Sequence, residues 1–505
     1  MVVTPRILAV LCAVTLVVAG ESANPLDQAE VILRIRDGAW VDREATRFAA
    51  AYGSDLASVR AELARVLFRS RGFEGIDLSR PALVAWRSGN APLLVAIPVS
   101  NRNEFLASFG AIDSTEAPLV RTGERDGTVI YKQNQPAGEW EYRLLVAGNV
   151  AYLARTTDEC RRLATALAVP VTDPSAAPVE LMLRGQGIRS PRLPGADWLD
   201  DLPASPIDGA ELTLVPGLLS RGWDGIADQV SYISITARTN TAGSLILNAR
   251  LNARPDSVLA GWITAQRPDT GRIAGQLKRP DTAVLICGQL TFQGQLERWG
   301  FDQAELLRTA GGRNWTESAD GAFRGLCTLA ERTGAFALAV ERTSKGLLQH
   351  WVVEHPRALE VAQSAAQVAS ALRGSEMTSL NVSGRPAMGM TTPTVATVCA
   401  SSDRHAVRTD DHADKHPATA AGDLLQRLEQ PGILTEQPSL ATVWVDLALA
   451  WNAPPTAEGE RAEPVVLTGA LRPTGASGLD LSTSVPLGAL GKLLGRLHKP
   501  ATKND

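Results

Sequence analysis

One stretch, residues 335–373, constrains the fold of this chain more than any other. Phe336, Leu338 and Val340 alternate with smaller or charged residues, and a Thr-Ser-Lys-Gly turn leads into a second strand-like run. Pro356 then stands where a first helical residue is expected, and the apolar spacing changes from alternation to a period of about 3.6 residues. The stretch therefore predicts a unit of strand, turn, strand and helix.

The same order of elements is expected at four other places, namely residues 82–109, 142–167, 232–264 and, more loosely, 442–497. In the second of these, Gly148 and Asn149 suit a tight turn, and Thr156 followed by Glu159 fits a helix capping box. Hairpins that are each followed by a helix predict an α+β fold, built from antiparallel sheets whose helices cover one face.

The first 23 residues are typical of a secretory signal peptide. Arg6 supplies the positive charge, an apolar run follows, and small residues precede the expected cleavage site. The apolar run is shorter than a membrane-spanning helix needs, although retention as an anchor remains the alternative. No later stretch is long and uncharged enough to span a membrane. We therefore expect an exported protein, periplasmic or extracellular.

The remaining chain is too long for one core. We expect an N-terminal α+β domain at residues 24–203 and a second at residues 204–400. Residues 401–422 are polar and short of large apolar side chains, so a linker or loop is predicted there. Residues 423–505 are expected to form a last strand-strand-helix unit that packs on the second domain.

The composition argues against some partners and for a bacterial source. The formal net charge of −4 is close to neutral for this length, so nucleic acid is not an expected partner. Seven Lys stand against forty-three Arg, a bias typical of GC-rich bacterial genomes. The final helix is amphipathic and basic; we favour its packing on the last sheet over contact with a membrane surface.

Four cysteines follow the predicted signal peptide: Cys160, Cys287, Cys327 and Cys399. An exported protein can form disulfides, but four cysteines allow three pairings and a chain of this length does not need a bridge. If one forms, Cys287 with Cys327 is the favoured pair, because both fall in one predicted domain.

The densest group of possible metal ligands lies in the polar segment. His412 and His416 have the i, i+4 spacing that zinc sites use, with His405 nearby. No Glu follows His412, and Pro417 disfavours a rigid helix. A solvated linker is therefore the preferred interpretation and a metal site the alternative. The carboxylates of the group are Asp403, Asp410, Asp411 and Asp414.

Motifs of catalysis and cofactor binding are absent from the sequence. There is no GxSxG, Ser-x-x-Lys or catalytic-cysteine signature, and Gly185-Gln186-Gly187 lacks the third glycine of a dinucleotide fingerprint. His350 and His355 flank a strand end, where a surface or satisfied histidine is favoured over a general base. Acids near Trp198 and Trp223 could cleave a glycosidic bond, but their number makes chance the simpler explanation.

A pair of expected helices after the first strand and five motifs carry a family resemblance. The motifs are EVILRIR at 30–36, GIDLSRPALVAW at 75–86, LLVAIPVSNRNEFLASF at 93–109, DGTVIYKQ at 126–133 and LLVAGNVAYLARTTDECRRLATAL at 144–167. With these motifs the chain resembles an uncharacterised family of exported bacterial proteins, known as a domain of unknown function. The resemblance covers residues 30–167, with a fainter echo over 232–373. Because that family carries no established activity, the resemblance implies no catalytic residue and no cofactor.

Together these features predict a non-enzymatic exported protein of the bacterial envelope. Its partner would be another envelope protein, or an apolar small molecule held between sheet and helices. The alternative is an extracytoplasmic hydrolase whose site is assembled only in three dimensions.

Overall fold

A computed structural model describes residues 26, 29–68, 72–86, 94–109, 119–135, 138–167, 177–189, 226–268, 272–289, 304–305, 307–309, 311–330, 334–343, 346–412, 416–430, 439–451 and 463–498. The chain divides into two compact units. Unit 1 comprises residues 1–202, 230–252 and 486–505, and unit 2 comprises residues 203–229 and 253–485. The predicted signal peptide and the predicted boundary at 203 lie outside the described residues.

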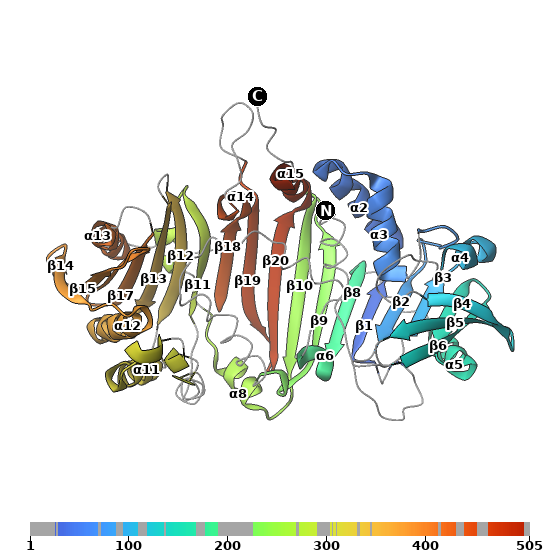
Figure 1. Ribbon diagram of the computed structural model, residues 1–505, viewed down its shortest axis with the longest axis horizontal. Helices are drawn as coiled ribbons and strands as arrows, with labels where there is room; N and C mark the ends of the chain where they lie inside the picture. The colour runs from blue at the N-terminus through green and yellow to red at the C-terminus, as the bar shows by residue number, and fades with distance from the viewer. Residues whose placement is uncertain are drawn as a thin grey trace. The chain divides into compact units, whose positions relative to one another are not determined.

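Unit 1 is an antiparallel sheet with helices in its connections (Figure 1). Its strands pair in the order β4-β5-β6-β7-β3-β2-β1-β8-β9-β10. The strands are β1 (Val31–Ile35), β2 (Ala82–Trp86), β3 (Leu94–Pro98), β4 (Leu119–Arg125), β5 (Thr128–Gln135), β6 (Gly138–Ala147), β7 (Val150–Ala154), β8 (Val179–Arg184), β9 (Val230–Thr239) and β10 (Ser244–Ala253). The helices are α2 (Gly38–Tyr52), α3 (Leu56–Phe68), α4 (Arg102–Ser108), α5 (Thr157–Leu167), α6 (Gln186–Arg189) and α15 (Leu487–His498).

The strands of unit 2 are also antiparallel, and they pair in the order β14-β15-β16-β17-β13-β12-β11-β18-β19-β20 (Figure 1). Its strands are β11 (Thr282–Gln289), β12 (Ala335–Thr343), β13 (Gly346–Glu354), β14 (Thr378–Val382), β15 (Arg385–Thr391), β16 (Ala396–Ser401), β17 (His405–Asp411), β18 (Ala441–Asp446), β19 (Val466–Thr474) and β20 (Gly478–Pro486). Its helices are α8 (Val258–Ala265), α9 (Arg272–Leu277), η3 (Gly312–Asn314), α11 (Glu317–Ala330), α12 (Ala358–Arg373), α13 (Pro417–Leu428) and α14 (Leu447–Ala450).

The two units share one strand topology. In each, the first three strands pair consecutively, and the seventh pairs with the third. The eighth strand lies on the other side of the first and leads to the last two. Each strand of unit 1 therefore has an equivalent in unit 2, which makes it possible to compare what each unit carries at the same position.

The helices of unit 2 cover both faces of its sheet, and the expectation that helices cover one face is wrong there. Leu424 on α13 belongs to the core cluster that contains Val407 of β17. Val361 on α12 instead packs in the cluster that contains Ala406, the neighbouring residue of the same strand. Because successive side chains of a strand point to opposite faces, α13 and α12 lie on opposite sides of the sheet.

Most described residues of the segment expected to be a linker or loop, residues 401–422, belong to a strand and a helix of the fold. Its first half includes β17, which pairs with β13 and β16, and its second half begins α13. Pro417 is the first residue of that helix. The backbone N–H at this position has no hydrogen-bond partner within the helix, so a proline, which lacks the N–H, fits there. The polar composition was misleading because Asp410 is neutralised inside the sheet by arginines rather than by water.

The last helix, α15, packs in unit 1 and not, as expected, on the second domain. It lies against α2 through Gly491 and Gly495, where an added Cβ would approach the backbone or Cβ atoms of Ala51 and Tyr52 to within 3.0 Å. Glycines spaced four residues apart let two helix backbones approach closely. Its leucines Leu487, Leu490, Leu493 and Leu494 are buried. Among the described residues, no helix is both long and apolar enough to cross a bilayer.

The predicted disulfide is absent. Cys160, Cys287, Cys327 and Cys399 are all buried thiols outside any disulfide. Cys287 lies on β11, where its Sγ is 2.9 Å from Thr442 Oγ1 on the neighbouring strand β18. Cys327 lies on helix α11, so sharing a predicted domain did not bring the two thiols together.

The capping box at the start of α5 is confirmed and gives a first prediction. The Glu159 backbone N–H donates to Thr156 Oγ1, and the Thr156 backbone N–H donates to Glu159 Oε2, each at 3.1 Å. Thr156→Ala leaves an amide without its partner and is expected to lower the free energy of unfolding by about 1 kcal/mol. Chemical denaturation measures this. Thr165→Ala, on an exposed turn of the same helix, is the control and is expected to cause no loss.

Candidate functional site

The three histidines of the alternative metal-site hypothesis do not converge. His405 begins β17 and His412 follows its end, so the strand holds them roughly 20 Å apart. His412 Nε2 lies 3.2 Å from Gln349 Nε2, while the His416 backbone N–H donates to Asp411 Oδ2. Burial lowers the pKa of His405. In the described parts of the chain, no group of three or more His, Cys, Asp or Glu residues could hold a metal ion. Asp414 lies outside those parts.

Asp410, one of the acids in that segment, forms the centre of a buried ionic network. Its Oδ1 accepts hydrogen bonds from Thr397 Oγ1 at 2.6 Å and from Arg373 Nη1 at 3.2 Å, and its Oδ2 pairs with Arg408 Nη2 at 2.8 Å. Burial opposes ionisation of this carboxyl group, but the two guanidinium groups and the hydroxyl outweigh it and lower its pKa. Asp410 is 1% exposed, so a charge is held here inside the sheet.

A second polar cluster lies on the opposite face of the sheet, under α13. The His350 side chain is fully buried, with Nδ1 3.0 Å from Thr409 Oγ1 and no hydrogen-bond partner at Nε2. Burial, with help from two nearby arginines, lowers the pKa of His350 to about 3. Glu341 Oε1 lies 4.0 Å from Arg427 Nη1, and burial raises the pKa of the Glu341 carboxyl group.

These two clusters are suited to holding the sheet together rather than to chemistry. Both oxygens of Asp410 are already bonded, and His350 has no exposed surface from which to take a proton from a substrate. They are also peculiar to one unit. β7, the equivalent of β17, reads VAYLA and carries no charged side chain. Unit 2 therefore carries polar groups where unit 1 has an apolar strand.

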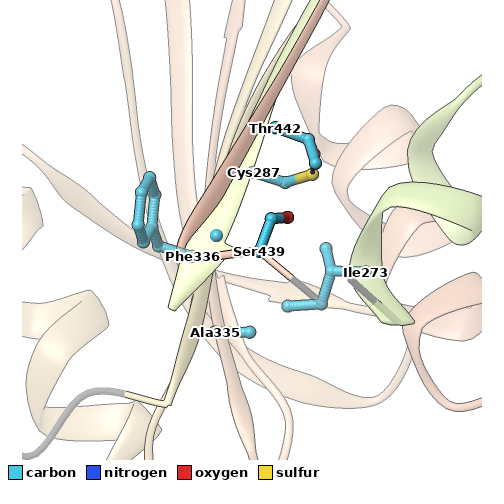
Figure 2. Close-up of a pocket in the computed structure, with 7 residues that line it drawn as sticks. Ile273, Cys287, Ala335, Phe336, Ser439 and Thr442 are labelled. Atoms are coloured by element: carbon cyan, nitrogen blue, oxygen red, sulfur yellow. Dashed lines mark hydrogen bonds between the residues drawn. The ribbon is translucent and has the colours of Figure 1, made fainter. Parts of the chain in front are cut away.

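A small pocket adjoins the Cys287–Thr442 pair in unit 2. Figure 2 shows the Cys287 thiol and the Thr442 and Ser439 hydroxyl groups on one side of the sheet, facing Ile273. Phe336 lies on the other side. The pocket measures about 10 Å³, which is room for about one water molecule and no larger ligand.

A larger cavity lies between α12 and the edge of the unit 2 sheet. Its volume is about 160 Å³. Leu359 and Ala362 line it from the helix, and Met388 and Cys399 line it from β15 and β16. Leu359 is 46% exposed, and Gln363 and Ser379 add polar groups to the lining. The full lining is Leu359, Ala362, Gln363, Ser379, Leu380, Pro386, Ala387, Met388 and Cys399. Such a site can hold a small, largely apolar molecule.

Sequence reasoning missed this cavity. Its walls come from α12 and three strands that follow it, and two of these strands, β14 and β15, were not predicted because Gly, Pro and polar residues interrupt them. The available signal was the close succession of the sulfur-containing residues Met388, Met390 and Cys399. The acids near Trp198 and Trp223 lie outside the described residues.

Comparison with known proteins identifies no relative. No protein-family model matches the chain, and no curated protein matches it. A solved structure described as "Structure of crystal form IV of TP0453" is 10% identical and covers 48% of this chain and 83% of its own, with a TM-score of 0.24. A TM-score this low carries no argument about function. The resemblance to an uncharacterised exported family stays a prediction.

Proposed function

We propose that this protein is a non-enzymatic binding protein of the bacterial envelope, whose ligand is a small apolar molecule held between α12 and β14–β16. The observation that carries the proposal is the 160 Å³ cavity at that place. A cavity of about this size accommodates a molecule such as benzene. The exposed edge at Leu359 gives such a ligand a route from solvent.

Export is the second part of the proposal. It rests on the signal-like first 23 residues. The test is fractionation of the native host followed by N-terminal sequencing of the purified chain. A mature chain that begins near residue 20 and is found outside the cytoplasm supports export. A chain that keeps Met1 and stays in the cytoplasm refutes it.

We also propose that the two units arose by duplication of one ancestral unit. The shared strand order of ten strands supports this, since every pairing of unit 1 has an equivalent in unit 2. The duplicated segment would then be a whole ten-stranded unit. The strand-turn-strand-helix repeat expected from the sequence would be a shorter part of each unit.

The binding proposal predicts the effect of filling the cavity. Ala362→Leu puts a larger side chain into the wall and is expected to weaken binding of fluorobenzene at least tenfold, as measured by fluorine NMR titration. Ala365→Leu makes the same change on the same helix, at a partly buried position outside the wall, and is expected to leave affinity unchanged. If Ala362→Leu and Ala365→Leu bound fluorobenzene with equal affinity, the fluorobenzene would bind outside this cavity and the proposal would be wrong.

The natural ligand is sought by native mass spectrometry of the mature protein from its own exported fraction, followed by organic extraction. A stoichiometric small apolar molecule, lost in Ala362→Leu, is the expected result. A bare protein mass together with no fluorobenzene binding would contradict a carrier role. It would then favour an envelope protein as the partner, to be sought by crosslinking in intact cells.

A further inference from the structure

The wall of the cavity formed by β15 and β16 carries two sulfur atoms. Met388 and Cys399 are directly opposite each other in the register of these strands, and both line the cavity. Side chains of directly opposed residues have Cβ atoms about 4.5–5.5 Å apart. Ser379 Oγ lies 3.8 Å from Met388 Sδ, which places the thioether beside another residue of the lining. A thiol and a thioether therefore share one side of the cavity.

A third sulfur lies on the same face. Met390 stands two residues beyond Met388 on β15, so both side chains point to the α12 side of the sheet. Met390 is buried, with 5% exposure. It is a diagonal neighbour of Cys399, a relation that long side chains can span. The whole sequence has five Met, and three of them fall between residues 377 and 390.

We propose that Cys399 and Met388 bind Cu(I) at this wall, with Met390 in reach as a third ligand. Thiolate and thioether sulfurs are the ligands that select Cu(I). On binding, the Cys399 thiol releases its proton to solvent and a bond forms between Sγ and the metal, with no change in oxidation state. The resulting thiolate–Cu(I) unit carries no net charge, so an apolar cavity can hold it at little desolvation cost.

The same lining disfavours other common metals. Zn²⁺ with one thiolate would keep a net positive charge, and it takes four ligands drawn from thiolate, imidazole and carboxylate groups. No imidazole or carboxylate is among the residues that line this cavity. Ca²⁺ takes six to eight oxygen ligands, and Mg²⁺ takes six, several of which are usually waters. Two sulfur atoms and an amide cannot replace such a set of oxygen ligands.

The test uses the mature full-length chain, reduced and kept without oxygen. Cu(I) is titrated in competition with bicinchoninate, and native mass spectrometry gives the stoichiometry. We expect the parent to bind one Cu(I) per chain. Met388→Leu should bind Cu(I) at least tenfold more weakly, and Cys399→Ala should no longer compete with bicinchoninate for the metal. Met182→Leu and Cys160→Ala are the matched controls, since both residues lie in unit 1, and they should bind as the parent does. X-ray absorption should show a shell of sulfur atoms alone.

Three outcomes would overturn the proposal: Cu(I) held by the parent no better than by Cys399→Ala, unchanged affinity in Met388→Leu, or nitrogen and oxygen in the metal shell. Leucine replaces methionine with little change of volume, and far-UV circular dichroism confirms that the variant is folded. This inference shares the cavity of the proposed function but does not need its apolar ligand. Met388→Leu should keep fluorobenzene binding while its Cu(I) affinity falls at least tenfold, so the two proposals can fail separately.

Discussion

Asp410→Asn is expected to lower the free energy of unfolding by about 3–5 kcal/mol. The substitution keeps the shape of the side chain and removes its charge. It removes the negative charge with which Asp410 pairs inside the sheet with Arg373, whose side chain is 6% exposed, and with Arg408. Removing one partner of a buried ion pair costs more free energy than the intact pair contributes on balance, which is why the expected loss is large.

Denaturant-induced unfolding of the parent and the variant measures this loss. Asp403→Asn, seven residues earlier on an exposed turn, is the matched control and should change stability by less than about 0.5 kcal/mol. A similar small effect for Asp410→Asn would mean that water reaches the two guanidinium groups. Because the folded-state pKa of Asp410 is lowered, its stabilisation is present at neutral pH. It is lost only as the pH falls below about 4, through the folded pKa.

Local sequence patterns predicted local structure well. The hairpin β6–β7 with its helix α5 lies where alternation, Gly148-Asn149 and the Thr156–Glu159 pair predicted it. The hairpin β12–β13 and helix α12 likewise agree with the change of apolar period near Pro356. These features depend on residues close together in the chain, so a single sequence contains the information needed to find them.

Long-range compensation is what the sequence could not show. β17 looked like a linker because Asp410 and Asp411 are polar, yet Arg373, thirty-seven residues away, neutralises Asp410. α15 was expected on the nearest sheet, but Gly491 and Gly495 fit α2, which lies at the other end of the chain. No periodicity in one segment can reveal a partner in another.

The candidate site escaped sequence analysis for the same reason. The metal-ligand group around His412 was noticed because its members are neighbours in sequence, but a strand holds His405 and His412 apart. The cavity beside Met388 and Cys399 was not noticed because its walls meet only when α12 packs over β15 and β16. Proximity in the chain was therefore a poor guide to proximity in the site.

His350 is expected to make the protein less stable as the pH falls from 7 to 5. Its pKa is about 3 in the folded protein, against an ordinary value of 6.5. The unfolded chain therefore takes up a proton below pH 6.5 that the folded protein does not. The stabilisation is complete above that pH and is lost progressively as the pH falls towards 3. From pH 7 to pH 5 the loss from His350 amounts to about 2 kcal/mol.

The groups that face His350 account for its low pKa. Burial against the sheet is the largest cause, and Arg427 on α13 and Arg279 before β11 both disfavour a second positive charge. Asp410 acts in the opposite direction but more weakly, since it lies on the other face and is already paired. Thr409 fixes the ring through Nδ1. A protonated His350 ring would thus be buried near Arg427 and Arg279, and the nearby Asp410 carboxylate is already paired with other arginines.

His350→Gln isolates this effect, because glutamine keeps a polar side chain that does not titrate. Denaturant unfolding of parent and variant at pH 7, 6 and 5 should show a difference that shrinks by about 2 kcal/mol across the range. Burial also lowers the pKa of His355 and His405, but both remain in the variant and cancel in the comparison. His416→Gln removes an exposed histidine and should follow the parent curve. If the free energy of unfolding fell by the same amount in the parent and in His350→Gln, the prediction would be wrong. The His350 ring would then be reached by solvent or would carry a proton in the folded protein.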